Sequence, residues 1–417
     1  MVQINRYDEI IKSLRHIQFI KNSHCVICQT RLGEPLIALP RFPLTEIYTP
    51  KLISEKLGFV DQFFHICSLC GHGQIQNIIA PEILYSTNYY FRTYISTSAM
   101  GALDHFVSFI HRVRGKKNFH TIIEIGCNDL YLLNSLKIKA KRFIGIDPIW
   151  KGKEQKRDNG KINVIGDLME NVHLDEGSGK VELVLSSHTL EHVKDPVLIL
   201  KRLLKTANDQ TLFVFQFPDL NLLIQNFRFD QIFHQHVNYF TLTSFLYLLD
   251  ECGGELLDYD FNPYHWGTLL VVFRKKQSRQ HKKSIRSVQS RGNFTPQQIV
   301  DRYRIFKNNL RLTNERLNAY KNGKIYGYGA ALMLPVLSYH LNNDLSCLEC
   351  VLDDDPRKDG WYYVNLPVKI RDTRKVRNLK QATILVTSVS AVMNVRKILS
   401  KLIVIDPQHI ISPLNIF

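Results

Sequence analysis

Strongly apolar runs that alternate with helical stretches are the feature that most limits how this chain can fold. Six such runs recur between residues 121 and 275, and three more follow residue 323. They read TIIEIG, RFIGID, INVIGD, VELVLSS, TLFVFQF and LLVVFR, then KIYGYGA, LECVLDD and ATILVTS. Short runs rich in β-branched residues and separated by helices are typical of parallel sheets covered on both faces. The alternation therefore predicts α/β domains with parallel sheets.

The chain of 417 residues is too long for one compact core. Its N-terminal part is rich in Cys, Pro and aromatic residues and lacks the alternation. At 45% hydrophobic and 22% charged residues, the composition excludes a disordered, collagen-like or coiled-coil protein. We expect an N-terminal domain at 1–98, an α/β domain at 99–275, a basic linker with an amphipathic helix at 276–320, and a second α/β domain at 321–417.

Positive charge is concentrated in one short region. The formal net charge is +16, and the fifty residues from Val271 to Tyr320 hold thirteen Lys or Arg against two Asp or Glu. The second half of this region has apolar residues at helical spacing, which predicts an amphipathic helix. These positions are Ile299, Tyr303, Phe306, Leu310 and Leu317. Because the charge lies outside every motif described below, it is weak evidence for nucleic acid and indirect evidence for a nucleotide diphosphate.

No apolar run approaches the roughly 18 residues that span a bilayer, and the first residues do not resemble a signal peptide. We expect a cytoplasmic protein with no membrane partner.

Four of the eight cysteines form two identical pairs, Cys25-x-x-Cys28 and Cys67-x-x-Cys70. Each pair places two thiolates on one side of a tight turn, and two pairs complete the tetrahedral sulfur set that suits Zn²⁺. A closed set of four cysteines leaves no open coordination position, so the metal would be structural. The alternative is four unrelated buried cysteines. The lone pair Cys347 and Cys350 is better explained by core packing or chance.

The first three strands of the central α/β domain carry acidic residues at their ends. The first strand ends at Glu124 and Gly126, the second at Asp147, and the third at Asp167 and Leu168. This order is typical of an S-adenosylmethionine pocket, in which the second acid accepts from the ribose hydroxyls. A dinucleotide site would show G-x-G-x-x-G in the first turn. An α/β domain with no ligand is the alternative. The expected cofactor residues are Glu124, Gly126, Asn128, Asp129, Asp147, Asp167, Leu168, Ser187 and His188.

Several motifs, in order and with similar spacing, resemble those of one known family. They are EIGCND, GIDP, SSHTLEHVKDP, FPDL, FHQHVNYFT and HWGT, preceded by the four cysteines and followed by GYGA and DDDPRKDG. The chain resembles the three-domain C-methyltransferases that act on nucleotide-linked deoxy-ketosugars. The resemblance implies a doubly wound, Rossmann-like methyltransferase domain, an N-terminal zinc-binding domain that also contacts substrate, and a C-terminal Rossmann-like α/β domain. It also implies a nucleotide-diphosphate sugar in the cleft between them.

Carbon methylation requires a carbanion, so the site needs a general base and a group that holds the developing oxyanion. The resemblance implies that His236 abstracts the proton, and we expect His234 and Gln235 as further catalytic residues beside it. In the family the corresponding stretch is typically Tyr-His-Glu-His, so Phe233 and Gln235 are departures. A His-x-His pair is also common as structure without catalysis. Further residues expected at the site are Tyr90 as a catalytic residue, and Phe233, His265, Gly267, Thr268 and Tyr328 as substrate contacts.

Other departures affect both halves of the expected site. Leu130 replaces a glycine where the cofactor comes close, Gln216 replaces a frequent glutamate, and Leu332 to Leu334 replace a polar, cationic segment. An altered or non-catalytic family member that still binds a nucleotide sugar is therefore an alternative. A nucleic-acid methyltransferase is a second alternative, but no Asn/Asp-Pro-Pro-Tyr/Phe motif follows the fourth strand. We expect no nucleic-acid partner, and a monomer or homodimer.

Overall fold

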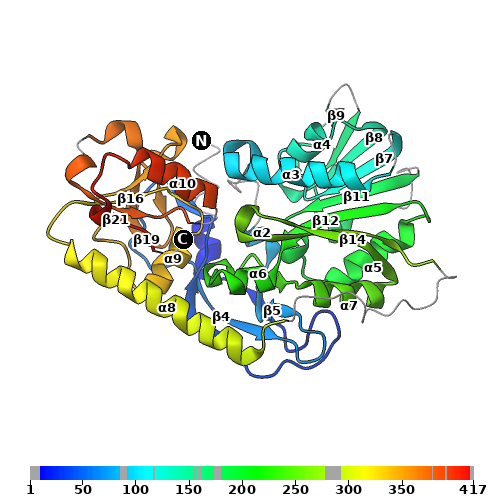
Figure 1. The fold of residues 1–417 in the computed structure, drawn as a ribbon, viewed down its shortest axis with the longest axis horizontal. Coiled ribbons are helices and arrows are strands. Elements are labelled where there is room, and N and C mark those ends of the chain that lie inside the picture. Colours follow the sequence, from blue (N-terminus) through cyan, green and yellow to red (C-terminus); the bar gives the residue numbers. More distant parts are fainter. Residues whose placement is uncertain are drawn as a thin grey trace.

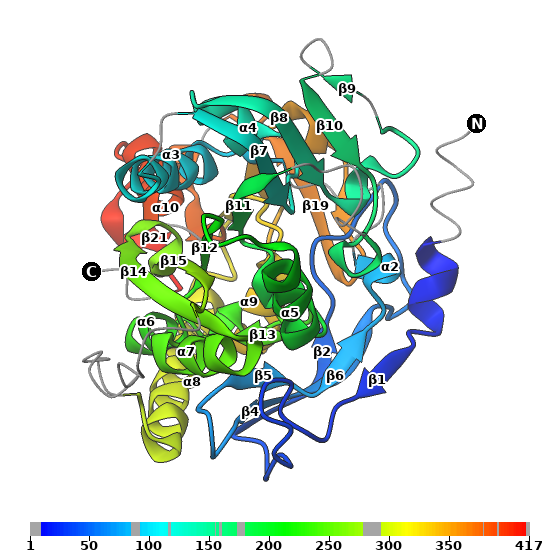
Figure 2. The same cartoon turned by 90° about the vertical axis from the view of Figure 1, so that its right-hand side faces the viewer.

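The computed structural model describes most of the chain. The molecule has two lobes, and a third, smaller unit joins them from below (Figures 1 and 2). One lobe holds the central part of the sequence, the other the C-terminal part. The described residues are 10–84, 92–115, 118–154, 156–157, 161–172, 180–277, 293–377, 379–389 and 392–413. None of the helices within these ranges is long and apolar enough to cross a membrane.

The central lobe is built on an eight-stranded sheet with the order β14-β15-β12-β11-β7-β8-β10-β9. Its strands are β7 Asn118–Ile125, β8 Lys139–Ile146, β9 Lys156–Arg157, β10 Ile162–Ile165, β11 Val181–Ser187, β12 Leu212–Pro218, β14 Gly254–Asn262 and β15 Thr268–Lys275. Strands β7, β8, β10, β11 and β12 are parallel, and β15 is antiparallel to both of its neighbours. Chain order reverses between β7 and β11, which is the switch point of a doubly wound sheet.

Helices cover both faces of this sheet (Figure 1). They are α3 Thr97–Val113 and α4 Tyr131–Ser135 on one face, and α5 Pro196–Thr206 and α7 Leu242–Cys252 on the other. Helix α6, Leu220–Gln225, packs instead in the core that is shared with the N-terminal unit and the C-terminal lobe. Ile122 and Ile123, adjacent on β7, point into different cores because side chains alternate along a strand. One core includes Phe106 of α3, and the other includes Leu200 of α5 and Phe245 of α7. The sheet is therefore buried on both sides, as its continuous apolar strands predict.

The C-terminal lobe has a second sheet with the order β21-β20-β16-β17-β19-β18-β3. Its elements are β16 Ile325–Tyr328, β17 Val351–Asp353, β18 Tyr362–Tyr363, β19 Leu366–Asp372, β20 Thr383–Val386, β21 Ile410–Ile411, α9 Leu334–Leu341 and α10 Val392–Lys401. The five strands from β21 to β19 are parallel, and chain order again reverses, here between β16 and β20. The fold class expected from the sequence, with two Rossmann-like α/β domains, is confirmed.

The N-terminal unit is antiparallel and exchanges strands with both lobes. Its strands are β1 Phe19–Lys21, β2 Ile37–Pro43, β4 Phe59–Ile66, β5 Gly73–Ile75 and β6 Asn77–Ile79, with the short helix α2 Pro81–Leu84. Strand β3, Tyr48–Thr49, completes the C-terminal sheet beside β18, and β13, Asn238–Tyr239, pairs with β5. The expected boundaries at 98 and 275 therefore do not separate independent sheets, because each lobe shares backbone hydrogen bonds with the N-terminal unit.

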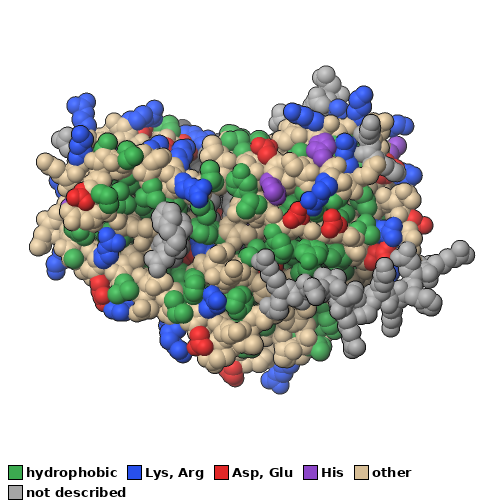
Figure 3. Space-filling view, in the orientation of Figure 1, with side chains coloured by type: hydrophobic (Ala, Val, Ile, Leu, Met, Phe, Trp, Pro, Cys, Tyr) green, Lys and Arg blue, Asp and Glu red, His purple; other side chains and the backbone are tan. Residues whose placement is uncertain are grey.

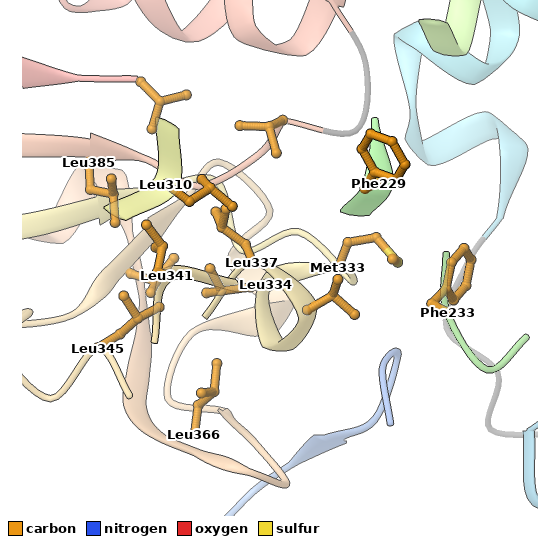
Figure 4. Packing of buried hydrophobic residues seen from close by; sticks show 14 of the residues in the cluster. Phe229, Phe233, Leu310, Met333, Leu334, Leu337, Leu341, Leu345, Leu366 and Leu385 are labelled. Carbon is orange, nitrogen blue, oxygen red and sulfur yellow. The ribbon is translucent and has the colours of Figure 1, made fainter. Parts of the chain in front are cut away.

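Helix α8, Pro296–Ala319, connects the two lobes along the bottom of the molecule (Figure 1). Thr295 caps its first turn and forms a capping box with Gln298. The apolar positions at helical spacing bury Phe306 and Leu310 in a core that continues through α9 into the C-terminal sheet. Figure 4 shows part of this core, with Met333 between the leucines of α9 and the phenylalanines of the 229–233 segment. One core thus joins elements from three parts of the sequence.

Candidate functional site

A cavity of about 920 Å³ lies between the two Rossmann-like sheets, where Figure 3 shows the outline of the molecule notched between the lobes. Glu124, Asp147 and Ser187 reach it from the central lobe, at or just beyond the carboxyl ends of β7, β8 and β11, and Tyr328 and Asp354 from the C-terminal lobe. Ligands of open α/β sheets bind outside the carboxyl ends of the strands at the switch point. The cavity occupies that position for both sheets at once.

The turn after β7 requires a glycine. Gly126 has a φ of +73°, and its amide donates to Ile146 O at 2.8 Å. A Cβ at this position would lie 2.0 Å from Thr189 Oγ1, which itself donates to Ile125 O. A side chain at Gly126 would therefore force the loop after β11 away, and that loop carries His188 into the cavity.

Two carboxylates meet at the ends of β7 and β8. Asp147 accepts hydrogen bonds from Asn128 N at 2.9 Å and Ile149 N at 3.0 Å, which fix it at the cavity wall. Glu124 is buried, and its Oε2 has no hydrogen-bond partner among the described residues. Burial, followed by the nearby charge of Asp147, raises the pKa of Glu124 well above its usual value. A buried acceptor without a partner is a site that a ligand donor can satisfy.

The remaining cofactor residues expected from the sequence also line the cavity. Asp129 accepts from Tyr94 N at 2.9 Å, and Asp167 accepts from Leu168 N at 2.8 Å. Ser187 Oγ accepts from Gln216 Nε2 at 2.7 Å. The nine predicted cofactor residues that line this one cavity are Glu124, Gly126, Asn128, Asp129, Asp147, Asp167, Leu168, Ser187 and His188. Carboxylates for ribose hydroxyls beside an apolar surface for a base fit S-adenosylmethionine.

Leu130 does not obstruct this pocket. Its φ of +66° places it in the left-handed region at the N-terminus of α4. The side chain is buried in the core with Leu133 and Ile138 and does not line the cavity. The leucine that replaces a glycine at this position therefore packs in the core and leaves the cavity wall unchanged.

The three polar residues of the FHQHV segment separate in space. His236 lines the cavity, and the centroid of its ring is 4.2 Å from the ring centroid of Phe233. His234 lies outside the cavity, where it accepts from Gln62 Nε2 at 3.2 Å and donates to Phe42 O at 3.1 Å. Burial lowers the pKa of His234 to about 4. The expected catalytic role of His234 is therefore corrected to a structural one.

Gln235 also points away from the cavity. Its Oε1 accepts from Thr45 Oγ1 at 3.1 Å, which ties the segment to the N-terminal unit. Its backbone carbonyl accepts from His192 Nδ1 at 2.8 Å. The side chain at position 235 is thus a link between units, and its expected catalytic role is likewise corrected.

A buried cluster around Glu191 was not anticipated, although the SSHTLEHV motif contains it. Glu191 lies in the short helix η4, Leu190–His192, and accepts from His188 Nδ1 at 3.1 Å. One side-chain ligand atom each of Glu191, His192 and His236 lies within 4.8 Å of the others. Burial raises the pKa of Glu191, but the hydrogen bond from His188 and the charge of His192 outweigh it and lower the pKa to about 2. A carboxylate therefore sits among three imidazoles at the cavity.

The expected substrate residues have mixed positions. Phe233 and Tyr328 line the cavity, and Tyr328 donates to Asp354 Oδ1 at 3.0 Å. Gly267 and Thr268 do not line it; Gly267 packs instead against Leu222 of α6. The predicted contacts through Gly267 and Thr268 are corrected to packing at the start of β15.

Two further predictions cannot be compared with the structure. Tyr90 lies outside the described residues, and so does the side chain of His265 in the turn Tyr264–Trp266.

The four predicted metal ligands converge. The Sγ atoms of Cys25 and Cys70 are 3.5 Å apart, and those of Cys28 and Cys67 are 3.4 Å apart. Zn–S bonds of about 2.3 Å in a tetrahedron would separate the sulfurs by about 3.8 Å, so a small expansion accommodates Zn²⁺. The contact between Cys25 and Cys70 lowers the pKa of Cys25 and raises that of Cys70, as expected when two thiols share one proton. Both turns pack against the central lobe in the core that includes Phe245 of α7.

Comparison with known proteins defines the class. Residues 99–258 match the family model of a methyltransferase domain, so the central lobe is a methyltransferase domain. The chain is also similar to the C-methyltransferase NovU of Streptomyces niveus, with 24% identity over 222 residues. The matched region is 52% of this chain and 51% of that protein, so the chain spans about half the length of the curated relative that it matches.

The solved structures that are similar to this chain match it with low TM-scores. One is a complex between the Haloferax volcanii Trm112 methyltransferase activator and a putative methyltransferase, with 12% identity, a TM-score of 0.35, and coverage of 42% of this chain and 90% of that chain. Another is 1,6-didemethyltoxoflavin N1-methyltransferase of Burkholderia thailandensis, with 14% identity, a TM-score of 0.33, and coverage of 43% and 80%. The fold assignment therefore depends on the strand order of the sheets.

Proposed function

We propose that the chain is an S-adenosylmethionine-dependent C-methyltransferase that methylates the carbon next to the ketone of a nucleotide-linked deoxy-ketohexose. One observation carries the proposal. The donor-side residues and His236 line a single cavity between two Rossmann-like sheets. A base and a methyl donor that share one cavity can act on the same carbon atom.

The donor would bind in the half of the cavity at the ends of β7, β8 and β10. Asp147, which two backbone amides hold at the wall, would accept from the ribose hydroxyls, and Leu168 and Met169 would offer an apolar surface to adenine. The partnerless Oε2 of Glu124 is available for a donor group of the ligand. Bound S-adenosylmethionine would supply an electrophilic methyl group, and the methylated carbon must therefore become a nucleophile.

His236 would make that carbon a nucleophile. Burial, followed by the neighbouring His192, lowers the pKa of His236 well below its usual value, so the imidazole is neutral near pH 7. A neutral imidazole can accept the proton when the C–H bond breaks, while the electron pair moves into the enolate. The enolate carbon would then form the new bond to the methyl group as the bond from that group to the sulfonium sulfur breaks, and the thioether S-adenosylhomocysteine would leave.

The sugar nucleotide would enter from the C-terminal lobe. Phe233 and Met333 make that side of the cavity apolar, and Lys397 and Arg357 bring cationic groups to it, with Arg357 ion-paired to Asp355. A ring that lacks hydroxyls suits the apolar wall, and a diphosphate suits the cations. Structural Zn²⁺ held by the four cysteines would fix the N-terminal unit against the methyltransferase domain.

Calorimetry with S-adenosylmethionine tests the first half of the proposal. We expect one equivalent to bind to the wild type and to His236→Gln alike. Transfer of labelled methyl to thymidine- and guanosine-diphosphate-linked deoxy-ketohexoses tests the second half. His236→Gln should abolish transfer, whereas the matched variant His120→Gln, at the far end of β7, should retain it.

Two results would refute the proposal. The absence of heat with S-adenosylmethionine would exclude the methyltransferase assignment. Donor binding with undiminished transfer by His236→Gln would identify a different base. Donor binding without transfer to any sugar nucleotide would favour the altered or non-catalytic alternative, which the substitution at position 233 supports.

A further inference from the structure

The position of one buried carboxylate suggests how His236 is supported. In the FHQHV segment the residue before His236 is a glutamine whose side chain contacts Thr45. That position supplies no carboxylate to the cavity. Glu191, which approaches from η4, lies instead beside the imidazoles.

Backbone contacts hold η4 against the segment that carries His236. Val237 N donates to Glu191 O at 2.8 Å, and His192 Nδ1 donates to Gln235 O at 2.8 Å. Asn238 Nδ2 adds a bond to Val193 O at 2.6 Å. Both sides of His236 in the sequence are therefore tied to η4, which fixes the distance between Glu191 and His236.

Glu191 is 1% exposed, and its Oε1 accepts from His188. Its Oε2 and the Nδ1 of His236 have no hydrogen-bond partner among the described residues. The described lysines and arginines form no ion pair with Glu191, whose charged partner within the described residues is His188 when that imidazole is protonated. An ionised carboxylate buried in this way needs a positive charge close by, and the surrounding imidazoles are the groups that can carry it.

We propose that Glu191 is the positioning residue of this site: it orients His188 directly and stabilises the imidazolium that forms when His236 accepts the substrate proton. The inference rests on the proposed function. The groups that face the cluster are His188 from the loop after β11, His192 from η4, Tyr239 from β13 and Asp147 across the cavity. The carboxylate that faces the imidazoles therefore comes from η4, whereas the side chain at position 235 contacts Thr45.

The test follows the histidine side chains by NMR in the full-length protein labelled with ¹³C at histidine Cε1. The signals of His188, His192 and His236 are assigned with single His→Gln variants. Removal of a negative charge within about 5 Å disfavours the imidazolium. Glu191→Gln should therefore lower the apparent pKa of His236 by about one pH unit and reduce methyl transfer at least tenfold. Donor binding should not change.

Three variants provide controls. Glu182→Gln removes a buried carboxylate near the N-terminal end of β11, the end away from the cavity, and should leave the titration of His236 unchanged. Glu191→Asp keeps the charge, so it should lower the apparent pKa of His236 by less than half as much as Glu191→Gln does. Gln235→Glu in the Glu191→Gln background should not restore the titration, because position 235 faces Thr45.

The outcomes separate this inference from the proposed function. Normal donor binding with an unchanged His236 titration in Glu191→Gln would overturn the inference and leave the proposed function standing. Rescue by Gln235→Glu would also overturn it. A second equivalent of bound metal, beyond the cysteine site, that disappears in Glu191→Gln would assign the cluster to cation binding instead. If Glu191→Gln does not fold, Glu191→Asp and its pH profile decide.

Discussion

Leu130 offers a prediction whose sign is unusual. Truncation of a buried leucine to alanine costs about 2 to 5 kcal/mol, and Leu130 is buried in the core that includes Leu133 and Ile138. The left-handed backbone at position 130 also costs roughly 1 to 2 kcal/mol for any residue with a Cβ, so leucine and alanine both carry this cost there. Glycine avoids that cost but loses about 0.4 to 1 kcal/mol to the greater freedom of its unfolded chain. Leu130→Gly should therefore be about 0.5 to 1 kcal/mol more stable than Leu130→Ala.

Leu133 is the matched control, since it is buried in the same core but lies within α4 with helical backbone. There Leu133→Gly should be less stable than Leu133→Ala by about 1 kcal/mol. The assay is urea unfolding of the four variants under identical conditions, with the differences taken within each pair. The order of glycine and alanine should reverse between the two positions.

Two results would refute this reasoning. If Leu130→Gly is no more stable than Leu130→Ala, the left-handed conformation of Leu130 is not a source of strain. If Leu130→Ala folds but loses S-adenosylmethionine binding, the side chain contacts the donor, contrary to its absence from the cavity wall.

Three other perturbations have expected outcomes. Asp147→Asn should weaken S-adenosylmethionine binding by about tenfold in calorimetry, because a carboxylate that accepts from hydroxyls is replaced; an unchanged affinity would contradict its role. Cys28→Ser should reduce bound zinc from one equivalent to none by elemental analysis and lower the melting temperature; undiminished zinc would exclude the cysteine site. The pKa of Glu191 is lowered to about 2, so the stability that its charge contributes is present above pH 4.5 and is lost as the pH falls toward 2. In Glu191→Gln the free energy of unfolding, measured with urea, should therefore change less with pH between 4.5 and 2 than it does in the wild type.

The convergence of the residues that we assign to the donor could be predicted from the sequence because it depends on local rules. Glu124, Asp147 and Asp167 end or follow consecutive parallel strands, and the carboxyl ends of such strands converge at one edge of the sheet. The four cysteines converge for a similar reason, since each Cys-x-x-Cys pair forms its own turn. In both cases the spacing along the chain determines the arrangement in space.

The acceptor half could not be predicted in the same way because it depends on contacts between distant segments. Gln235 contacts Thr45, and β13 pairs with β5, across long separations in sequence. Those contacts rotate His234 and Gln235 out of the cavity and leave His236 in it. A pattern such as His-x-His specifies neither the partner strand nor the register that selects one histidine.

The residues that differ from the motifs of the family that the sequence resembles do not all affect the cavity. Leu130 points into the core and Gln235 contacts Thr45, so neither substitution changes the wall of the cavity. Phe233 does line the cavity, and its ring lies 4.2 Å from that of His236. A phenyl ring cannot donate the hydrogen bond that a tyrosine would offer to a keto oxygen. Under the proposed function, any difference in chemistry from the family that the sequence resembles should therefore concern how the acceptor oxygen is held, and donor binding should be retained.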